Sequence, residues 1–317
     1  MSRAQTIALL GATGTAGRAT AIALRSAGHA VTALGRRDPG IDGIAFAPVT
    51  VTHAASLGAA LDALRPDAVV SCLASRSGAP ADAWAIDHGA NLALLAAARS
   101  AGAEHFILLS AICVQKPRLA FQHAKLAFEA ALIGSGLTWS IVRPTAFFKS
   151  VSGQLDRLRA GKPYLIFGDG RLTACKPISD ADLGAFIASC LGDPARQNAI
   201  LPIGGPGPAL TPLDMGHALF AALDMPPRFR AVSPRVIRTL GATFALGGRI
   251  SPRLAAKAEL ARIGHYYATE SMLHWDAASG RYDADATPET GTHTLPDFYR
   301  ALAAGEVRLD RGDHAVF

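Results

Sequence analysis

Short apolar runs alternate with longer alanine-rich stretches through the first half of the chain, and this pattern predicts its secondary structure. Apolar runs bounded by turn residues predict five strands, at Thr6–Leu10, Ala30–Leu34, Ala68–Cys72, Phe106–Ser110 and Thr138–Val142. The stretches between them predict helices at Ala16–Ala27, Ser56–Leu64, Ala83–Ser100 and Phe121–Ser135. Strands and helices that alternate in this way build a parallel sheet covered by helices on both faces. We therefore expect an α/β fold with a Rossmann-type, doubly wound parallel sheet.

Turn residues become frequent after Arg143-Pro144, and this change in composition indicates where the first domain ends. Glycine and proline cluster at residues 161–163 and again at 202–208, between short strand-like and helix-like stretches. We expect a Rossmann domain over residues 1–145 and a smaller mixed α/β region over residues 146–317. Some segments of the second region are expected to return to the first sheet.

Composition and cysteine usage narrow the class of protein. Half of the 317 residues are apolar and 18% are charged, a composition that excludes intrinsic disorder. The cysteines lie far apart, so they predict neither a zinc site nor a secreted disulfide framework: Cys72, Cys113, Cys175 and Cys190. The first apolar run is too short for a signal peptide, and no run reaches the roughly 20 residues of a membrane span. We expect a soluble or at most surface-bound protein of a reducing compartment, without a metal site.

A glycine-rich loop follows the first predicted strand and opens the first predicted helix. It reads Gly11-Ala12-Thr13-Gly14-Thr15-Ala16-Gly17, with glycines at a GxxGxxG spacing. The first glycine allows a tight turn, the second lets the backbone approach a pyrophosphate, and the third lets the helix pack on the strand. The N–H groups and positive dipole of the helix N-terminus attract phosphate. This context predicts a dinucleotide site formed by Gly11, Thr13, Gly14 and Gly17.

The end of the second predicted strand indicates which dinucleotide is bound. This strand is followed by Gly35-Arg36-Arg37-Asp38, with no acid before Asp38. An acid at this position holds the ribose 2′-hydroxyl of NAD, whereas a basic residue accommodates the 2′-phosphate of NADP. Because a guanidinium group binds phosphate in a bidentate fork, Arg36 and Arg37 predict NADPH as the cofactor. The alternative is a pair of solvated surface arginines.

Further along the chain, a strand-end serine, Ser110, precedes a helix that begins Phe121-Gln122-His123-Ala124-Lys125. A strand-end serine followed by a YxxxK helix is typical of short-chain dehydrogenases, and the chain resembles the extended or atypical branch of that superfamily. The resemblance implies that Lys125 is catalytic and hydrogen-bonds the nicotinamide ribose. Phenylalanine stands at the tyrosine position, so the usual general acid of alcohol–ketone chemistry is missing. Two functions remain: reduction of a carbon–carbon double bond, or a non-enzymatic role as an NADP-sensing regulator or assembly protein.

Longer blocks of sequence resemble one family in particular. They are Val70–Arg76, Ser110–Pro117, Val142–Ser150, Phe167–Ser179, Leu201–Gly207 and Arg262–Leu273. These blocks are similar to the NADPH-dependent divinyl chlorophyllide 8-vinyl reductases, which also have phenylalanine where the superfamily has tyrosine. The resemblance implies reduction of the 8-vinyl group of a magnesium chlorin, divinyl chlorophyllide or protochlorophyllide, to ethyl, for chlorophyll or bacteriochlorophyll synthesis. The N-terminus lacks a Ser/Arg-rich plastid leader, so a bacterial cytoplasmic enzyme is expected.

The remaining candidate residues follow from this resemblance and from sheet geometry, since ligands bind at the carboxyl ends of parallel strands. Besides the residues above, the cofactor pocket is expected to include Ser71, Cys72, Leu73, Ala74, Pro144 and Phe147. Substrate contacts are expected from Phe121, Phe148 and Lys149. The alternatives are core packing for Phe148 and a solvated surface position for Lys149.

For several other side chains, the sequence allows either a chemical or a structural role. Proton-donor candidates, which the sequence does not rank, are Ser110, His123 and Tyr164. Lys149 is the first candidate for pairing with a substrate propionate carboxylate, and Lys176 is the second; for both, the alternative is a solvated surface lysine. Asp87 and Asn91, one helical turn apart, are expected to tie the fold together or to border the cofactor. Packing is favoured over a direct role for Cys175, Tyr266 and Tyr267.

The net charge of +6 is concentrated in one segment. Residues 226–263 carry eight basic residues and one acid, whereas the rest of the chain has 23 basic and 24 acidic residues. A basic segment interleaved with apolar residues suits peripheral contact with an anionic photosynthetic membrane, or steering of a substrate carboxylate. The ordinary alternative is a solvated helix face. The total charge is too small to indicate nucleic-acid binding.

Overall fold

Seven strands form one parallel sheet within the described residues of the computed structural model, which are 3–76, 78–248 and 251–308. Their order is β3-β2-β1-β4-β5-β6-β8, and every neighbouring pair is parallel. The strands are β1 Thr6–Leu10, β2 Ala30–Gly35, β3 Ala45–Pro48, β4 Ala68–Ser71, β5 His105–Leu109, β6 Thr138–Pro144 and β8 Ala199–Ile203. This arrangement confirms the predicted Rossmann-type fold.

All five predicted strands are present, each within two residues of its predicted ends. Every residue of β4 and β5 is buried, which explains why these strands appear in the sequence as continuous apolar runs. Strands β3 and β8 were not predicted. Two of the four residues of β3 are exposed and the other two are half-buried, so the strand carries no strong apolar signal. Strand β8 is distant in sequence from its partner β6, and only the tertiary fold brings Ile200 opposite Ile141.

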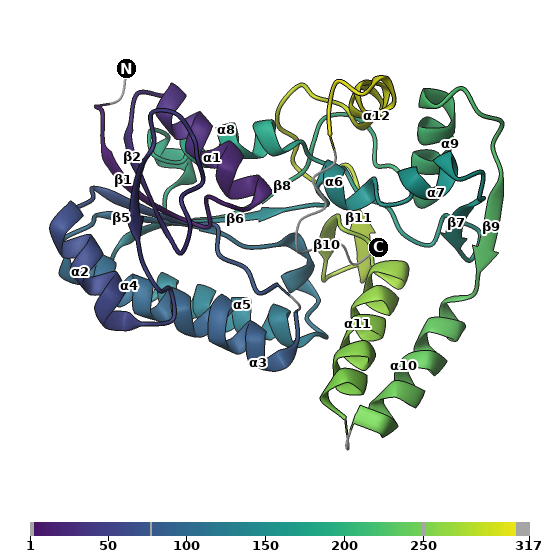
Figure 1. The fold of residues 1–317 in the computed structure, drawn as a ribbon, viewed down its shortest axis with the longest axis horizontal. Helices are drawn as coiled ribbons and strands as arrows, with labels where there is room; N and C mark the ends of the chain where they lie inside the picture. Colours follow the sequence, from purple (N-terminus) through teal and green to yellow (C-terminus); the bar gives the residue numbers. More distant parts are fainter. Residues whose placement is uncertain (1–2, 77, 249–250, 309–317) are drawn as a thin grey trace. The chain divides into compact units, whose positions relative to one another are not determined.

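Helices cover both faces of this sheet (Figure 1). One face carries α1 (Thr15–Ser26) and α8 (Asp180–Ser189), and the other carries α2 (Ala54–Leu64), α4 (Asn91–Ser100) and α5 (Ala120–Ile133). Helices α1 and α8 approach closely at Gly184, where a Cβ would lie 2.6 Å from the backbone carbon of Ala19. Beneath the other face, the rings of Phe106 and Phe128 lie 5.8 Å apart between centroids, in the main core of the sheet.

The helix predicted over Ala83–Ser100 is not one continuous α-helix. The structure has α3 (Pro80–Ala83), then a π-helical segment, η1 (Trp84–Ala90), and then α4. Inside the wider turn, the side-chain amide of Asn91 donates to the carbonyls of Ile86 and Asp87, at 3.2 and 3.1 Å. A π-turn of this kind leaves little trace in an apolar pattern, because the segment stays helical. The prediction of a helix was correct, and the structure adds that Trp84–Ala90 is π-helical.

Contacts between residues divide the chain into two units. Unit 1 comprises Met1–Ser75, Pro80–Pro144 and Asp180–Ile203. Unit 2 comprises Arg76–Ala79, Thr145–Ser179 and Gly204–Phe317. Strand β8 therefore belongs to the Rossmann sheet and helix α8 to the same unit, although both follow residue 145 in the sequence.

Unit 2 is a mixed α/β structure with two short sheets. Strand β7 (Tyr164–Phe167) pairs in parallel with β9 (Phe229–Val232), and β10 (His274–Asp276) pairs antiparallel with β11 (Arg281–Asp283). Its helices are α6 Phe148–Val151, α7 Leu155–Arg159, α9 Pro212–Ala222, α10 Pro234–Gly248, α11 Pro252–Thr269 and α12 Leu295–Ala304. The core gathers around Tyr299, whose hydroxyl donates to the carbonyl of Val151 at 2.8 Å. Among the described residues, no helix combines the length and apolar character needed to cross a bilayer.

Candidate active site

The glycine-rich loop is shaped by contacts within unit 1. Gly11 has a φ of +84°, and a Cβ on it would lie 2.5 Å from the carbonyl oxygen of Cys72. A Cβ on Gly17 would lie 2.1 Å from the carbonyl oxygen of Gly11. Both positions therefore require glycine for the packing of the protein itself. Gly14 differs, because a Cβ there would make only an ordinary contact, 3.4 Å from the oxygen of Gly11.

The N-terminus of α1 fits a phosphate group. Gly14 is the N-cap, no side chain caps the helix there, and the first turn holds no acidic residue. Thr13 and Gly14 are exposed, so the loop is accessible where a pyrophosphate would approach. The positive end of the helix dipole and the backbone N–H groups suit that anion. The missing side chain at Gly14, which internal packing does not demand, supports a dinucleotide site at this loop.

The loop after β2 presents Arg36 and Arg37 as exposed side chains. The Asp38 carboxylate accepts the N–H of Gly40 at 2.8 Å, so it closes the turn. Arg18 of α1 donates to the carbonyl of Pro39 at 2.7 Å and brings a third guanidinium group to this loop. Sequence reasoning missed Arg18, because its neighbours are known only once the loop is placed against α1. The cluster of guanidinium groups suits the 2′-phosphate of NADP.

The carboxyl end of β4 and the residues after it pack against the glycine loop. Ser71 is fully buried and donates its hydroxyl to Oδ1 of Asn91 at 2.6 Å. The backbone of Cys72 packs against Gly11, and burial raises the pKa of the Cys72 thiol to about 12, so the thiol stays neutral. Leu73 is half-buried and Ala74 is exposed. Contact of this segment with the cofactor stays a prediction.

Lys125 lies on the second turn of α5, and its ammonium group is almost completely buried. Its Nζ lies 2.9 Å from Oδ1 of Asp87, and the two side chains are 11% and 1% exposed. The other carboxylate oxygen of Asp87 accepts the N–H of Ser75 at 3.3 Å. An ammonium group has three N–H donors, and the contact with Oδ1 of Asp87 uses one of them. The remaining N–H groups of Lys125 are not committed to this carboxylate.

The first turn of α5 is fixed by Gln122, which sequence reasoning did not single out. Its side-chain oxygen accepts the N–H groups of Arg118 and Leu119, at 2.7 and 2.9 Å. Its side-chain amide donates to the carbonyl of Cys113 at 3.1 Å. Phe121 is half-buried one turn before Lys125, at the place of the superfamily tyrosine. The helix that carries Lys125 is thus tied to the loop after β5.

Ser110, the strand-end serine, has its proton engaged inside the protein. Its hydroxyl donates to the buried carboxylate of Glu129. Arg143 pairs with the same carboxylate through both Nε, at 3.2 Å, and a terminal nitrogen. The Glu129 carboxylate thus accepts hydrogen bonds from both side chains. Ser110 therefore offers acceptor lone pairs, rather than a proton, to a ligand.

The other two proton-donor candidates, His123 and Tyr164, also lie away from the position of the superfamily tyrosine. His123 is exposed, and it lies two residues from Lys125 on a helix, so the two side chains leave α5 on different faces. Tyr164 is 4% exposed in the core of unit 2, with its ring 5.9 Å from that of Phe229. Burial raises the pKa of the Tyr164 hydroxyl to about 12. Neither position resembles that of the missing superfamily tyrosine.

The residues assigned to the nicotinamide pocket and substrate belong to both units. Pro144 is buried at the end of β6 in unit 1. In unit 2, Phe147 is half-buried and forms an isolated parallel bridge with Ile178, and Lys149 is also half-buried. Phe148 is 2% exposed, and its ring lies 5.3 Å from that of Phe298. Core packing accounts for Phe148, whereas ligand contacts by the other three stay predictions.

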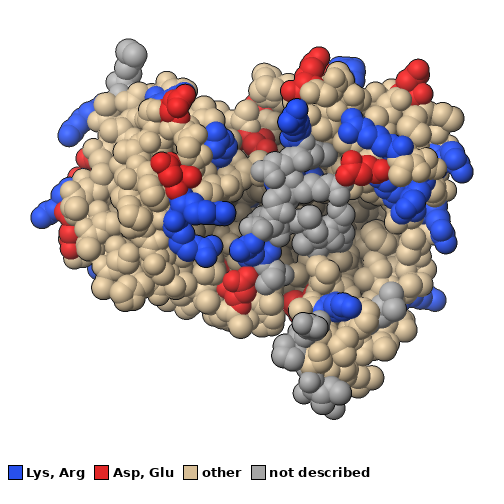
Figure 2. Space-filling view, in the orientation of Figure 1, with Lys and Arg blue, Asp and Glu red and all other residues tan. Residues whose placement is uncertain are grey.

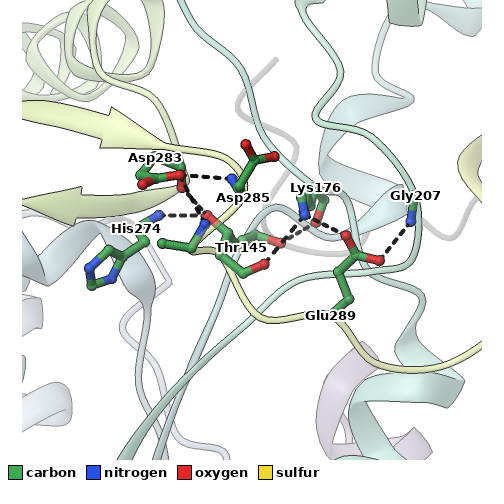
Figure 3. Close-up of polar contacts among 9 residues, drawn as sticks. Thr145, Lys176, Gly207, His274, Asp283, Asp285 and Glu289 are labelled. Atoms are coloured by element: carbon green, nitrogen blue, oxygen red, sulfur yellow. Dashed lines mark hydrogen bonds and ion pairs between the residues drawn. The ribbon is translucent and has the colours of Figure 1, made fainter.

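Lys176, the second candidate for a substrate propionate, has an internal partner in unit 2 (Figure 3). Its buried ammonium pairs with Glu289 and donates to the carbonyl of Thr287 at 3.4 Å. Glu289 also accepts the N–H of Gly207 at 3.1 Å, and its hydrogen bond with Lys176 lowers the pKa of the Glu289 carboxyl. The charge of Lys176 therefore links two distant segments of unit 2.

Cysteine and metal chemistry have no assembled site in the described part of the chain. Cys175 is buried between backbone partners at Leu210 and Met272, and burial raises the pKa of its thiol to about 12. Within residues 3–76, 78–248 and 251–308, no group of three or more His, Cys, Asp or Glu side chains could hold a metal ion. Tyr266 is 4% exposed and packs edge-on against Tyr267, with 5.5 Å between ring centroids.

A glycine loop that suits a phosphate group, a basic loop after β2 and a buried lysine on α5 are the features of an NAD(P)H-binding protein of the atypical short-chain dehydrogenase class. The model of the NAD(P)H-binding family matches residues 11–194. The chain is 44% identical over 332 residues to the chloroplastic divinyl chlorophyllide a 8-vinyl-reductase of Oryza sativa subsp. indica, which covers 98% of this chain and 82% of that protein. The enzyme of the same name from Zea mays is also 44% identical, over 98% of this chain and 83% of its own length. The chain belongs to the divinyl chlorophyllide a 8-vinyl-reductase family.

The fold itself is shared with a solved reductase of different sequence. The NADPH-dependent quinone oxidoreductase of Escherichia coli, solved with NADPH, superposes with a TM-score of 0.69 at 18% identity. The superposition covers 93% of this chain and 99% of the Escherichia coli protein. At this identity the likeness concerns the fold alone.

Proposed function

We propose that this protein uses NADPH to reduce the 8-vinyl group of divinyl chlorophyllide a to an ethyl group. The observation that carries the proposal is the 44% identity to the rice 8-vinyl-reductase over 98% of this chain. The glycine loop and the basic loop of unit 1, which suit NADPH, support it. The product would enter the synthesis of chlorophyll or bacteriochlorophyll.

Different residues of this chain bind the cofactor and the substrate. NADPH, when bound, supplies a hydride to the vinyl group, and a proton completes the ethyl group. The glycine loop holds the pyrophosphate, Arg36 and Arg37 hold the 2′-phosphate, and Lys125 holds the nicotinamide ribose. Phe121 has no exchangeable proton, which disfavours alcohol–ketone chemistry and agrees with hydride transfer to carbon. Phe147 and Lys149 of unit 2 are the proposed substrate contacts.

The test is a direct conversion assay. The protein is incubated with divinyl chlorophyllide a and NADPH, and in parallel with divinyl protochlorophyllide, while the Soret band is followed. We expect a blue shift, one NADPH oxidised per pigment reduced, and a product heavier by two hydrogen atoms. Binding of NADPH without conversion of either pigment would contradict the enzymatic proposal and favour an NADP-sensing regulator or assembly protein.

Cofactor choice tests the basic loop separately. Replacing Arg36 and Arg37 together with alanine is expected to raise the Kd for NADPH at least about tenfold, because each lost guanidinium–phosphate contact is charge-assisted. The Kd for NADH, which lacks the 2′-phosphate, should change little. Arg99→Ala, at an exposed position in the last turn of α4, is the control. An unchanged preference for NADPH in the double variant would remove the loop from cofactor selection.

We also propose that α10 and α11 contact an anionic membrane surface from the cytoplasm. Both helices expose large apolar side chains beside basic ones: Val236, Leu246 and Leu260 are 50%, 69% and 42% exposed. Exposed basic side chains on the same helices are Arg235, Arg238, Lys257 and Arg262. Figure 2 shows mainly uncharged surface over the lower end of these helices, with Lys and Arg at its margins. Arg249 lies outside the described residues. Exposed apolar surface next to basic groups is typical of interfacial helices.

Charge reversal tests this membrane proposal. Arg235→Glu combined with Arg238→Glu is expected to weaken binding to vesicles of anionic lipid at least about tenfold, since each basic group contributes about 1 kcal/mol near such a surface. Arg3→Glu with Arg99→Glu makes the same change in net charge at exposed positions of unit 1. Sedimentation with neutral and anionic vesicles gives the measurement. Equal loss in both double variants would indicate a general charge effect rather than a surface on α10 and α11.

A further inference from the structure

The π-helical segment η1 gives unit 1 an unusual feature beside Lys125. A π-turn is rare and occurs frequently at functional sites. Here it is braced by Asn91, whose amide bonds the carbonyls of Ile86 and Asp87 and whose oxygen accepts the Ser71 hydroxyl at 2.6 Å. These hydrogen bonds connect the turn to the carboxyl end of β4, and ligands of such sheets bind at the carboxyl ends of the strands.

The result of this turn is the position of the Asp87 carboxylate. It is 1% exposed, accepts one backbone N–H, from Ser75, and lies 2.9 Å from the Lys125 ammonium. Because an ammonium group has three N–H donors, its contact with Asp87 alone does not satisfy Lys125. A buried ion pair contributes little to stability unless its remaining groups are satisfied. Stability of the fold alone therefore does not account for this pair.

The neighbouring charged groups leave Asp87 as the partner of Lys125. The Cys72 thiol, across from the lysine, stays neutral because burial raises its pKa. Glu129, one turn further along α5, is held by Arg143 and by the Ser110 hydroxyl. On the described residues that surround Lys125, Asp87 is the carboxylate in direct contact with the ammonium.

We propose that Asp87 is a positioning residue, which holds the ammonium of Lys125 so that its uncommitted N–H groups meet the nicotinamide ribose of NADPH. Asp87 acts through Lys125 and does not itself touch the cofactor. The π-turn, Asn91 and Ser71 hold Asp87 in turn. The proposal rests on the NADPH site of the proposed function and is independent of the pigment.

The test is a double-mutant cycle on NADPH binding, measured by nicotinamide fluorescence without substrate. Asp87→Asn keeps the shape and the acceptor for Ser75 but removes the charge. We expect Asp87→Asn and Lys125→Met each to raise the Kd for NADPH about tenfold or more. The double variant should bind no more weakly than Lys125→Met, because Asp87 acts only through the lysine. Failure of pigment reduction would leave this cycle unaffected.

Two further variants separate positioning from folding. Asp67→Asn makes the same change just before the amino end of β4, away from the carboxyl ends of the strands. The Asp67 carboxylate accepts the N–H of Thr6 at 2.7 Å, and its replacement should leave the Kd for NADPH unchanged. If Asp87→Asn does not fold, Asn91→Ser removes the brace while it keeps the charge, and should also weaken binding. An unchanged Kd in a folded Asp87→Asn or Asn91→Ser, or additive effects of Asp87→Asn and Lys125→Met, would overturn the proposal.

Discussion

Replacing Lys125 with methionine is expected to lower kcat/KM for vinyl reduction by at least about 10²-fold, the largest loss we expect from a single side chain of unit 1. Methionine keeps much of the apolar stem of the lysine but removes the ammonium group that holds the nicotinamide ribose. The measurement is the conversion of divinyl chlorophyllide a at saturating and limiting NADPH. Lys162→Met, at an exposed position after α7, is the matched control and should retain full activity. Activity of Lys125→Met close to that of the control would remove the lysine from the active site.

The same substitution leaves the Asp87 carboxylate buried without its countercharge, and this has a separate cost. Removing one partner of a buried ion pair costs about 3–5 kcal/mol. Lys125→Met should therefore melt at a lower temperature than the parent protein. The double variant with Asp87→Asn contains neither charge, so it should recover most of the lost stability while it stays inactive. Recovery of activity together with stability would mean that the lysine served only the fold.

The parts of unit 1 that could be predicted from sequence are those whose signal is local. Five strands are recognisable as short apolar runs bounded by turn residues, and in β4 and β5 the burial of every residue makes the run continuous. The glycine loop is recognisable because Gly11 and Gly17 are required by contacts with nearby backbone. Strand β3 is half-exposed and strand β8 pairs with a distant partner, so neither carries such a signal.

The partners of the candidate residues could not be predicted, since they are distant in sequence and depend on the fold. The carboxylate that contacts Lys125 comes from a π-turn, which an apolar pattern cannot distinguish from an α-helix. Lys176 resembles a substrate-binding lysine in the sequence, but it pairs with Glu289, 113 residues further along. A charged side chain in a motif is thus ambiguous until its neighbours are known. The ion pairs formed inside the protein determine which charged side chains remain available to ligands.

The glycine loop contains two positions at which alanine should weaken NADPH binding but differ in its effect on stability. In Gly17→Ala the new Cβ would lie 2.1 Å from the backbone oxygen of Gly11, so the loop must move or α1 must shift. We expect a loss of about 3 kcal/mol or more in the free energy of unfolding, together with loss of NADPH binding. Thermal melting with and without NADPH gives both quantities. A stable Gly17→Ala would mean that the loop adopts another conformation.

Gly14→Ala is the matched variant, because its Cβ would lie 3.4 Å from the same oxygen and its backbone, with φ −83° and ψ 161°, is accessible to alanine. The melting temperature should stay within about 2 °C of the parent, since nothing in the protein is displaced and the unfolded chain loses some freedom. The Kd for NADPH should nevertheless rise at least about tenfold, because the added methyl group stands where the pyrophosphate approaches the N-terminus of α1. Loss of affinity without loss of stability would locate the cofactor at this glycine, whereas unchanged affinity would place the phosphates elsewhere.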